Sequence, residues 1–474
     1  MEYRKRVATV YLLGFFIDLA NLFVGNVAFP AIVRDFHCGV TELAWVGTAY
    51  ILGLTVVIPL GGWLAARWGG KRAFMFSLLL FILASFAAGC ARSLPELVAW
   101  RALQGLGGGL LIPLGQTMTY RLFHASERPG LTAAILLVGQ LAPALSPMLG
   151  GLAVDGLGWR WIFWLNAPLA ALPLCLAWLW LREEREPEPA AAMDWRGLFL
   201  GAAALLSLLL GLSELAQASA RALGAACVLL SLASAAAYVR HSRRCERPLL
   251  RLDLLGEPLL RQSMWVYLSA PGVFMGVSLA AMLYLQQVLG MAAGAAGLLM
   301  LPWSLAAFFA ISLTGRRYRT WGPQPLIMSG AAAQAAGILL LLAVESPDQW
   351  LLLTLSYAAM GLGGSLCSSA SQSTAFLRIP PARMAEASAW WNINRQTAFC
   401  LGTALVSLLL SCMLAAMGVS DAGAASARSA ASLAFHACFL IAACAMLAPL
   451  WLGARMRNDE ALALAAAPQT QGEG

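Results

Sequence analysis

The sequence predicts an all-α integral membrane protein with fourteen transmembrane helices. Of its 474 residues, 60% are hydrophobic and only 11% are charged, which is too little charge to cover a soluble protein. Apolar segments near the ~20 residues needed to cross a bilayer recur along the whole chain. Because lipid offers the backbone no hydrogen bonds, these segments are expected to be helices. The predicted segments are 7–29, 43–65, 73–91, 95–119, 130–153, 161–181, 196–215, 221–239, 263–287, 294–314, 325–344, 350–374, 386–413 and 433–453.

The distribution of positive charge supports this count. If the N-terminus is cytoplasmic, 24 of the 31 Lys and Arg residues fall in cytoplasmic segments and 5 in external ones. The remaining two, Arg101 and Arg395, lie within predicted helices. This bias follows the positive-inside rule and places both termini in the cytoplasm. The same bias explains the net charge of +8. We therefore expect the partner to be a lipid bilayer and not nucleic acid.

Other functional classes find little support in the sequence. The ten cysteines are scattered without a CxxC pair, and the four histidines show no metal-ligand spacing, so we expect no metal and no cofactor. The chain has neither HExxH nor GxSxG, which argues against an intramembrane enzyme. The basic start before residue 7 resembles a signal peptide, but its apolar run is too long, and we expect an uncleaved first helix.

The chain contains two related halves. Two short loops, Gly61 to Arg72 (GGWLAARWGGKR) and Thr314 to Pro323 (TGRRYRTWGP), carry Gly, Arg, Trp and Gly in similar order. They fall at equivalent places if segments 196–215 and 221–239 are an insertion. Repeated bundles are typical of secondary transporters, which bind substrate between the halves. The predicted parts are a six-helix bundle at 1–181, a linker with the inserted pair at 182–262, a pseudo-twofold-related six-helix bundle at 263–453, and a cytoplasmic tail at 454–474 without fixed structure after Arg457.

Five stretches together resemble the major facilitator superfamily, and more narrowly its fourteen-span drug:proton antiporter branch. The stretches are Asn26 to Pro30 (NVAFP), Gly62 to Arg72, Arg101 to Gly109 (RALQGLGGG), Ser146 to Gly151 (SPMLGG) with Trp159 to Pro168 (WRWIFWLNAP), and Tyr284 to Gly290 (YLQQVLG). The resemblance implies multidrug efflux: alternating access, a small lipophilic substrate exported in exchange for protons, and a proton gradient across a bacterial inner membrane. A narrow-specificity metabolite exporter and a non-transporting receptor or channel stay as alternatives. The need for an envelope efflux partner stays open.

This sequence departs from the family pattern at four positions. Ala66 stands where the loop motif usually has Asp, and Gly70 stands where it has Arg. Ser146 replaces the Gly of the Gly-Pro pair. The family's acid in the first helix lies nine residues before the Pro of the NVAFP stretch, and Asn21 occupies that position here.

Asp18 and Arg101 are the predicted proton-coupling residues. Asp18 lies one helical turn from Asn21 and roughly 16 Å from the cytoplasmic end, near mid-membrane. A carboxyl group removed from water takes up a proton more readily, which suits a proton-coupled exchanger. Arg101 lies about level with Asn21 and needs an anionic partner, for which Asp18 is the expected mate. The alternatives are a structural charge at Asp18 and an Arg101 side chain that snorkels to the outer surface.

A central substrate cavity is predicted from polar residues that accompany aromatic ones at mid-depth, because that combination suits an amphipathic ligand. Hydrogen bonding between helices is the alternative for the Asn and Gln residues. The predicted cavity residues are Asn21, Gln104, Tyr284, Gln286, Trp303, Trp390, Asn392, Asn394 and Arg395.

Two further groups are assigned through the resemblance. The first is a gating loop, whose basic residues would bind helix ends at the cytoplasmic gate; topology by positive charge alone is the alternative. The second is a bent antiporter helix, which in the family marks exporters and seals against leak, with prolines that bend it and glycines that pack it. The gating residues are Gly62, Arg67, Gly69, Lys71 and Arg72, and the antiporter-helix residues are Pro143, Pro147, Gly150 and Gly151.

Overall fold

The computed structural model is helical apart from short turns, and its described residues contain no strand. It describes residues 2–37, 40–124, 126–183, 193–215, 220–246, 248–291, 293–419 and 428–466. Within these ranges the backbone alone is described for residues 22–27, 29–30, 33–34, 40–44, 143–144, 147–149, 151–152, 155, 213, 293–294 and 466.

The first bundle consists of seven helices, two of which form one bent segment. Helices α2 and α3 meet at 56° across a short break that contains Pro59, as expected because proline cannot continue the hydrogen-bond ladder. The helices are α1 (Tyr3–Phe36), α2 (Val40–Val57), α3 (Leu60–Trp68), α4 (Gly70–Gly89), α5 (Leu94–Leu122), α6 (Arg128–Leu157) and α7 (Arg160–Trp180).

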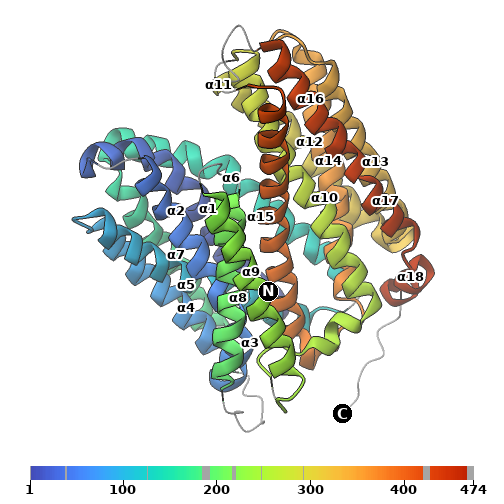
Figure 1. Ribbon diagram of the computed structural model, residues 1–474. Helices are drawn as coiled ribbons and strands as arrows, with labels where there is room; N and C mark the ends of the chain where they lie inside the picture. The colour runs from blue at the N-terminus through green and yellow to red at the C-terminus, as the bar shows by residue number, and fades with distance from the viewer. Residues whose placement is uncertain are drawn as a thin grey trace.

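The inserted helices α8 (Trp195–Leu215) and α9 (Arg221–Ser242) pack mainly on each other. Gly211 and Gly224 allow this approach, since a Cβ on Gly211 would lie 3.0 Å from the carbonyl oxygen of Gly224. Helix α8 also touches α2 and α15, so the pair lies beside both bundles, in front of them in the view of Figure 1.

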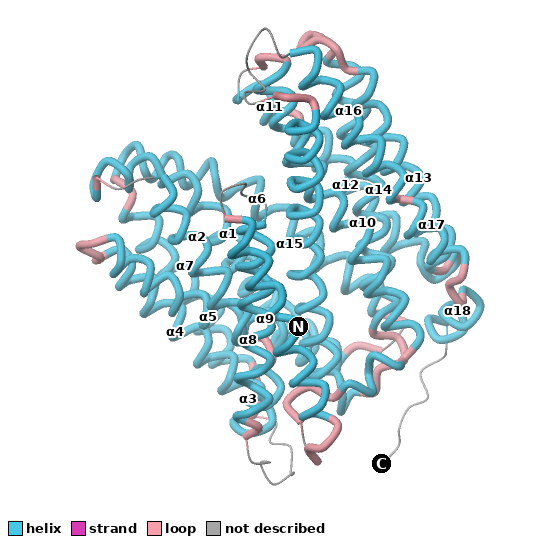
Figure 2. The backbone as a smooth tube through the Cα atoms, viewed as in Figure 1, coloured by secondary structure: helices cyan, strands magenta, loops and turns pink. Residues whose placement is uncertain are grey.

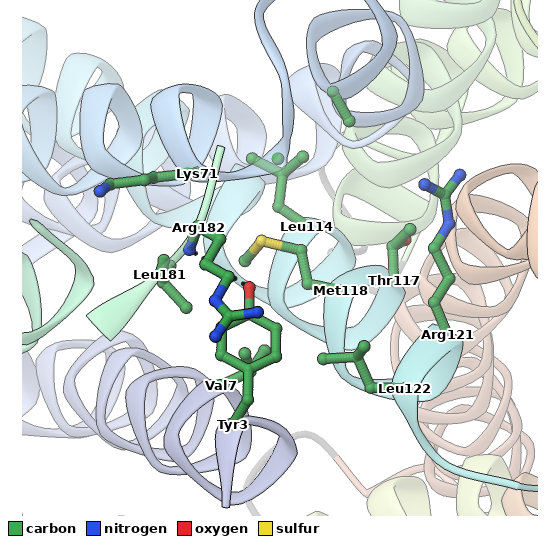
Figure 3. A pocket seen from close by; sticks show the side chains of 12 residues that line it. Tyr3, Val7, Lys71, Leu114, Thr117, Met118, Arg121, Leu122, Leu181 and Arg182 are labelled. Atoms are coloured by element: carbon green, nitrogen blue, oxygen red, sulfur yellow. Dashed lines mark hydrogen bonds between the residues drawn. The ribbon is translucent and has the colours of Figure 1, made fainter. Parts of the chain in front are cut away.

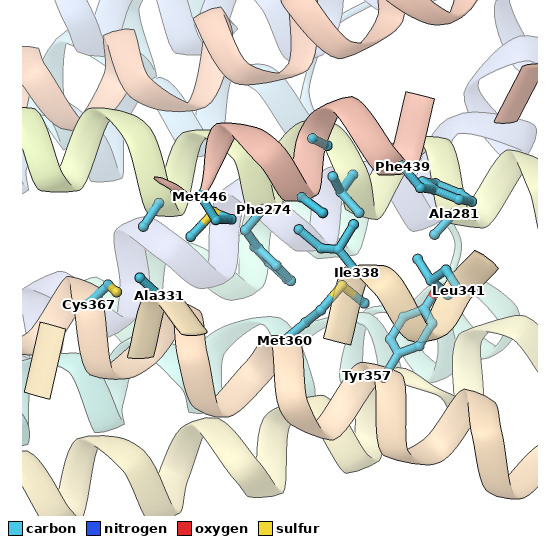
Figure 4. Close-up of a cluster of buried hydrophobic side chains, with 14 of the residues drawn as sticks. Phe274, Ala281, Ala331, Ile338, Leu341, Tyr357, Met360, Cys367, Phe439 and Met446 are labelled. Carbon is cyan, nitrogen blue, oxygen red and sulfur yellow. The ribbon is translucent and has the colours of Figure 1, made fainter. Parts of the chain in front are cut away.

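The second bundle follows a short 3-10 turn at Leu252–Gly256. Figure 4 shows part of its large apolar core. A π-helical turn at Tyr284–Val288 extends α10. The helices are α10 (Pro258–Leu283), α11 (Ala293–Leu298), α12 (Met300–Trp321), α13 (Pro323–Leu340), α14 (Trp350–Ala375), α15 (Met384–Ala416), α16 (Arg428–Ala445), α17 (Leu447–Ala454) and α18 (Asn458–Ala466).

Each of the fourteen predicted segments coincides with helix. Among the described residues, eleven helices are long and apolar enough to cross a membrane, and the bent pair α2 and α3 would make a twelfth. The two other predicted segments, 7–29 and 130–153, fall on α1 and α6, in which several side chains are not described. A multi-pass helical membrane protein is therefore confirmed, whereas the number fourteen stays a prediction.

The two bundles converge at one end of the molecule and diverge at the other (Figures 1 and 2). The end where they meet carries the α5–α6 and α14–α15 turns, and we call it the joined end. Side-chain hydrogen bonds connect residues 2–183 with residues 258–466 at this end. They run from Arg121 to the carbonyl of Pro381, from Arg128 to the carbonyl of Phe376, and from Asn392 to Gln116.

The start of the tail corrects an expectation. Residues after Arg457 were expected to lack fixed structure, yet α18 packs on the second bundle. The Asn458 side chain accepts a hydrogen bond from the Gln324 backbone N–H at 3.1 Å and donates to the carbonyl of Trp321 at 3.2 Å. Ala461 and Ala465 are buried. A short, alanine-rich sequence gives a weak signal by itself, and the surface of the bundle supplies the missing stability.

Candidate functional site

Asp18 lies inside the first bundle, with only 1% of its surface exposed. Its carboxylate accepts a hydrogen bond from the hydroxyl of Tyr50 on α2. The carboxylate also lies directly against the backbone of α5, since a Cβ on Gly108 would come within 2.2 Å of Asp18 Oδ1. Only glycine permits this approach, so α1, α2 and α5 together enclose the acid.

A second group of buried polar side chains surrounds Asn21, one turn further along α1. Its Oδ1 atom accepts hydrogen bonds from Arg101 Nη1 at 3.2 Å, Gln104 Nε2 at 3.1 Å and Asn166 Nδ2 at 2.8 Å. Gln104 also binds Arg101 Nη1 at 2.7 Å and Ser85 Oγ at 2.6 Å. The oxygen of Asn21 thus receives three donors, including a guanidinium group, as a carboxylate in its place would.

The expected direct pairing of Arg101 with Asp18 is wrong for this conformation. Among the described residues no ion pair joins them; Arg101 binds Asn21, Gln104 and the carbonyl of Val46 at 3.1 Å. The Arg101 guanidinium instead lies 4.4 Å from the centre of the Tyr50 ring, in cation–π contact. Tyr50 therefore connects the two charges, because its ring faces Arg101 while its hydroxyl binds Asp18. Arg101 is buried rather than extended toward the outer surface.

The predicted residues of α15 lie where the two bundles meet. Asn392 donates to Gln116 of α5 at 3.0 Å, and Asn394 donates to the carbonyl of Met264 on α10 at 3.1 Å. Trp390 packs against apolar residues of the first bundle and donates to the carbonyl of Arg251. Arg395 is within electrostatic range of Asp18.

The predicted cavity residues Tyr284, Gln286 and Trp303 do not join that group. Tyr284 is fully buried in the core of the second bundle and donates to the carbonyl of Val344 at 2.6 Å. Trp303 stacks on Phe274 with 5.3 Å between the ring centres. Gln286 is half-buried on the π-helical turn. In this conformation these three residues belong to the interior and the end of the second bundle.

The predicted gating loop binds a helix end within its own bundle. Lys71 donates to the carbonyl of Trp178 in the last turn of α7 at 2.8 Å, where a cation complements the helix dipole. Arg72 forms an ion pair with Glu183, just past that helix. Gly69 turns the chain between α3 and α4 with φ +81°, which favours glycine.

Two other residues of that loop face different partners. Arg67 lies over the ring of Trp63. Gly62 approaches the second bundle, since a Cβ there would lie 3.5 Å from Ala385 Cβ of α15. Of the predicted loop residues, Gly62 is thus the one placed against the opposite bundle.

The antiporter-helix residues belong to α6. Gly150 is buried within it. Ser146, which replaces the family's Gly, donates its hydroxyl to the carbonyl of Ala142. The side chains of Pro143, Pro147 and Gly151 lie outside the described residues, so the predicted bend stays a prediction.

A pocket at the joined end of the first bundle lies between α1, α5 and the start of α4 (Figure 3). The Arg182 guanidinium covers the ring of Tyr3 at 5.0 Å. Arg121, at its rim, extends toward the second bundle and donates to the carbonyl of Pro381. This pocket is separate from Asp18, which is enclosed by protein.

One trio within the described residues could hold a metal ion, which the sequence spacing did not indicate: Asp194, His241 and Cys245. The Asp194 carboxylate is already engaged, since it accepts N–H groups from Gly197 and Leu249 and binds His241 at 2.7 Å. Burial by itself would raise the pKa of Asp194, but these hydrogen bonds outweigh it and hold that pKa below its usual range. Arg240, Arg243 and Arg244 nearby in the sequence add positive charge, which disfavours a metal cation. The trio is better explained as a clasp, that is, a polar contact that joins the start of α8 to the end of α9 through Asp194 and His241.

Sequence reasoning missed three polar residues of this site, Tyr50, Ser85 and Asn166, and gave Gly108 of the RALQGLGGG stretch no role beside Asp18. Asn166 lies in the WRWIFWLNAP stretch, and a buried amide in a predicted helix could have been selected. Ser85 and Gly108 have no comparable signal, because serine and glycine are frequent in membrane helices as packing residues, and Tyr50 lies in none of the stretches that carry the resemblance.

Comparison with known proteins identifies the family. The model of the Major Facilitator Superfamily matches residues 11–403. The chain belongs to the major facilitator superfamily. It is 29% identical over 411 residues to the drug efflux pump JefA of Mycobacterium tuberculosis, covering 85% of this chain and 80% of that one. It is 32% identical over 413 residues to the Multidrug resistance protein B homolog of the same species, covering 86% and 76%.

Solved structures confirm the fold. The human organic anion transporter MFSD10 superposes with a TM-score of 0.67 at 17% identity, covering 96% of this chain and 100% of that one. The proton:xylose symporter XylE gives a TM-score of 0.61 at 18% identity, covering 95% of each chain. The predicted resemblance is thus confirmed: this is a transporter-family protein whose relatives include multidrug efflux pumps.

Proposed function

We propose that this protein exports small amphipathic or lipophilic compounds in exchange for protons, by alternating access between the two bundles. Membership of the superfamily and relatives named as drug efflux pumps support export. The single observation that carries proton coupling is the buried carboxyl of Asp18, which has a tyrosine hydroxyl as its hydrogen-bond donor and lacks a direct cationic partner among the described residues. An acid in such a place can change its protonation state during transport.

In this proposal the coupling acid, Asp18, lies one helical turn from the position that it has in the family, which Asn21 occupies here. Asn21 occupies the family position and binds Arg101, Gln104 and Asn166, but it cannot carry a proton. Asp18 supplies the titratable group nearby, and Tyr50 connects it to Arg101. Arg101 then organises the site through Asn21 and Tyr50 rather than by direct pairing.

The conformation supports an outward-facing state. The positive-inside rule places the α5–α6 and α14–α15 turns in the cytoplasm, so the joined end is the cytoplasmic one. The two bundles diverge toward the opposite side (Figure 1). The full proposal is fourteen membrane-spanning helices, with bundles at 1–181 and 263–453 related by pseudo-twofold symmetry and both termini in the cytoplasm of a bacterial cell.

The substrate site in this proposal lies at the bundle interface near α15. Trp390, Asn392, Asn394 and Arg395 offer an aromatic surface, two amides and one cation there. A dicationic substrate would face Arg395, so neutral, monocationic or anionic lipophilic compounds fit better. Opening the joined end would break the Asn392–Gln116 hydrogen bond and uncover this surface.

The decisive experiment measures efflux of a panel of lipophilic dyes in inverted membrane vesicles under an imposed proton gradient. Wild type is compared with Asp18→Asn, Asn21→Asp and the double variant. We expect gradient-driven transport that Asp18→Asn abolishes. The double variant is expected to regain part of it, because the acid returns to the family position beside Arg101.

Two outcomes would contradict the proposal. Transport that Asp18→Asn leaves unchanged would remove Asp18 from coupling. Absence of transport of every dye by a folded wild-type protein would favour the narrow-specificity exporter, and absence of any proton-linked flux would favour a receptor or channel.

A further inference from the structure

Arg395 is a charged side chain of the second bundle directed at the interface with the first. It lies in the middle of α15, and its Nε atom is buried without a hydrogen-bond partner among the described residues. Its neighbours on the same helix have partners: Asn392 binds Gln116 and Asn394 binds the carbonyl of Met264. The Arg395 side chain as a whole is only partly buried, so a guanidinium with an unpaired buried Nε at this depth gains from a compensating charge nearby.

The packing of α5 locates Arg395 relative to Asp18. A Cβ on Gly115 would lie 2.2 Å from the Tyr11 ring, and one on Gly108 would lie 2.2 Å from Asp18 Oδ1. Tyr11 and Asn392 are therefore both at the level of residues 115–116 of α5. Helix α15 runs antiparallel to α5 in the predicted topology, so Arg395 lies one turn nearer to Asp18, with about 8 Å of axial separation remaining.

The charged and titratable groups around this pair are few. Arg395 acts electrostatically on Asp18 and Tyr11 of α1 and on Tyr267 of α10. Asp18 in turn is faced by Tyr50 of α2, Arg101 of α5 and Arg395 of α15. Of the two cations, Arg101 has its own acceptors in the first bundle. Arg395 comes from the opposite bundle, so its attraction to Asp18 acts across the interface.

We propose that Arg395 is the mobile counter-charge of Asp18. Ionised Asp18 attracts Arg395 across the interface and stabilises closure of the joined end, and protonation of Asp18 removes that attraction and favours opening there. This inference rests on the proposed role of Asp18 in coupling, and it adds a physical link from proton binding to bundle movement. The hydrogen bonds from Arg121 and Arg128 to backbone carbonyls close the same end without a titratable acceptor.

The test measures the conformation directly rather than transport. Spin labels are attached to non-canonical residues at positions 92 and 348, which are exposed on different bundles at the diverging end, so that the native cysteines remain. Distances are measured in lipid nanodiscs between pH 8 and pH 5. In wild type the population with a long distance should fall as the pH is lowered, because loss of the attraction opens the joined end and brings the diverging end together.

The variants separate this role from simple stabilisation. Arg395→Gln should lower the ratio of long to short distances at pH 8 by about five- to tenfold, within the range typical of coupled sites, and should remove most of its pH dependence. Asp18→Asn should do the same, and the double variant should match each single one, since both remove one interaction. Arg395→Lys, which keeps the charge, should retain the pH response, and Arg316→Gln, which removes an exposed arginine of α12, should leave it unchanged.

Several results would overturn the inference. A pH response in Arg395→Gln equal to that of wild type would do so, as would additive effects of the two single variants. If Arg395→Gln fails to fold, loss of the pH response in Arg395→Lys, with its charge preserved, would also count against it. If one of these results came together with proton-driven transport that depends on Asp18, the role of Arg395 would fall and the proposed function would stand. A pH-dependent conformation without any transport would contradict the proposed function and leave the role of Arg395 standing.

Discussion

The interiors of the two bundles contain different kinds of polar groups. The described residues of the first bundle bury three charged side chains, Asp18, Arg101 and Arg128, whereas those of the second bury only uncharged polar groups. A buried charge is costly even when it is well hydrogen-bonded, whereas hydroxyls and amides commonly hold membrane helices together. The difference indicates that buried charges belong to the interior of the first bundle and that the interior of the second is built mainly for packing, as Figure 4 illustrates, whereas the charge of Arg395 lies at the interface.

The run of hydroxyl residues from Ser368 to Thr374 on α14, together with Ser356 on the same helix, fits the packing role. Ser369 donates to Thr314 at 2.8 Å, and Ser356 donates to the carbonyl of Gly337 at 2.7 Å. Thr374 and Tyr318 share a hydrogen bond of 2.6 Å. These contacts join α12, α13 and α14 inside the second bundle.

The largest effect is expected from replacing Arg101 by Met. Asn21, Gln104 and the carbonyl of Val46 would lose their donor in a buried site, which should cost about 3 kcal/mol in folding free energy and abolish transport. The matched change in the second bundle is Gln334→Met, which removes one hydrogen bond to the carbonyl of Ala270 and should cost about 1 kcal/mol. Thermal unfolding in detergent compares the two, and equal losses would break the distinction between the bundles.

Glycine-to-alanine exchange sharpens the same comparison. Gly108→Ala would force the carboxylate of Asp18 and the hydroxyl of Tyr50 away from α5, with about 1–3 kcal/mol of strain and a loss of proton-driven efflux. Gly364→Ala in α14 would meet Gln334 Oε1 at 3.4 Å, a contact that should leave efflux unchanged. Normal efflux by a folded Gly108→Ala protein would argue against a fixed position for Asp18.

Tyr284→Phe tests the packing role of the second bundle. The exchange removes the hydrogen bond to the carbonyl of Val344 and the contact with His436 at 3.1 Å. It should lower stability by about 1 kcal/mol and leave the dye specificity of efflux unchanged. A changed substrate profile in the same vesicle assay would instead place Tyr284 in the substrate path.

The smallest effect concerns Asp194, which lies outside both bundles. Because its pKa is held below its usual range, its clasp stabilises the fold at neutral pH and loses strength as the pH falls below about 4, the ordinary pKa of aspartate. Asp194→Asn should cost about 1 kcal/mol or less at pH 7 and remove this acid dependence. The control measures thermal unfolding of the wild type with and without added zinc. Zinc should not raise the stability if the trio of Asp194, His241 and Cys245 is not a metal site.

The fold was largely predictable because membrane helices are specified locally. Length, apolar character and charge asymmetry each act on one segment at a time, and every predicted segment is helical in the structure. The tail was the exception, since α18 depends on Trp321 and Gln324 of the bundle it packs against.

For the site, the sequence predicted several of the residues that take part but not the contacts between them. The sequence by itself determined that Arg101 and Gln104 lie near the level of Asn21, one helical turn from Asp18, because helical rise and periodicity fix their depth and face. Only the tertiary structure decided which side chains interact: Tyr50 rather than Arg101 donates a hydrogen bond to Asp18, and Arg395 of the other bundle comes within electrostatic range of it. Those choices depend on distances between helices remote in sequence, and close approaches such as that at Gly108 set them, so no local pattern in the chain encodes them.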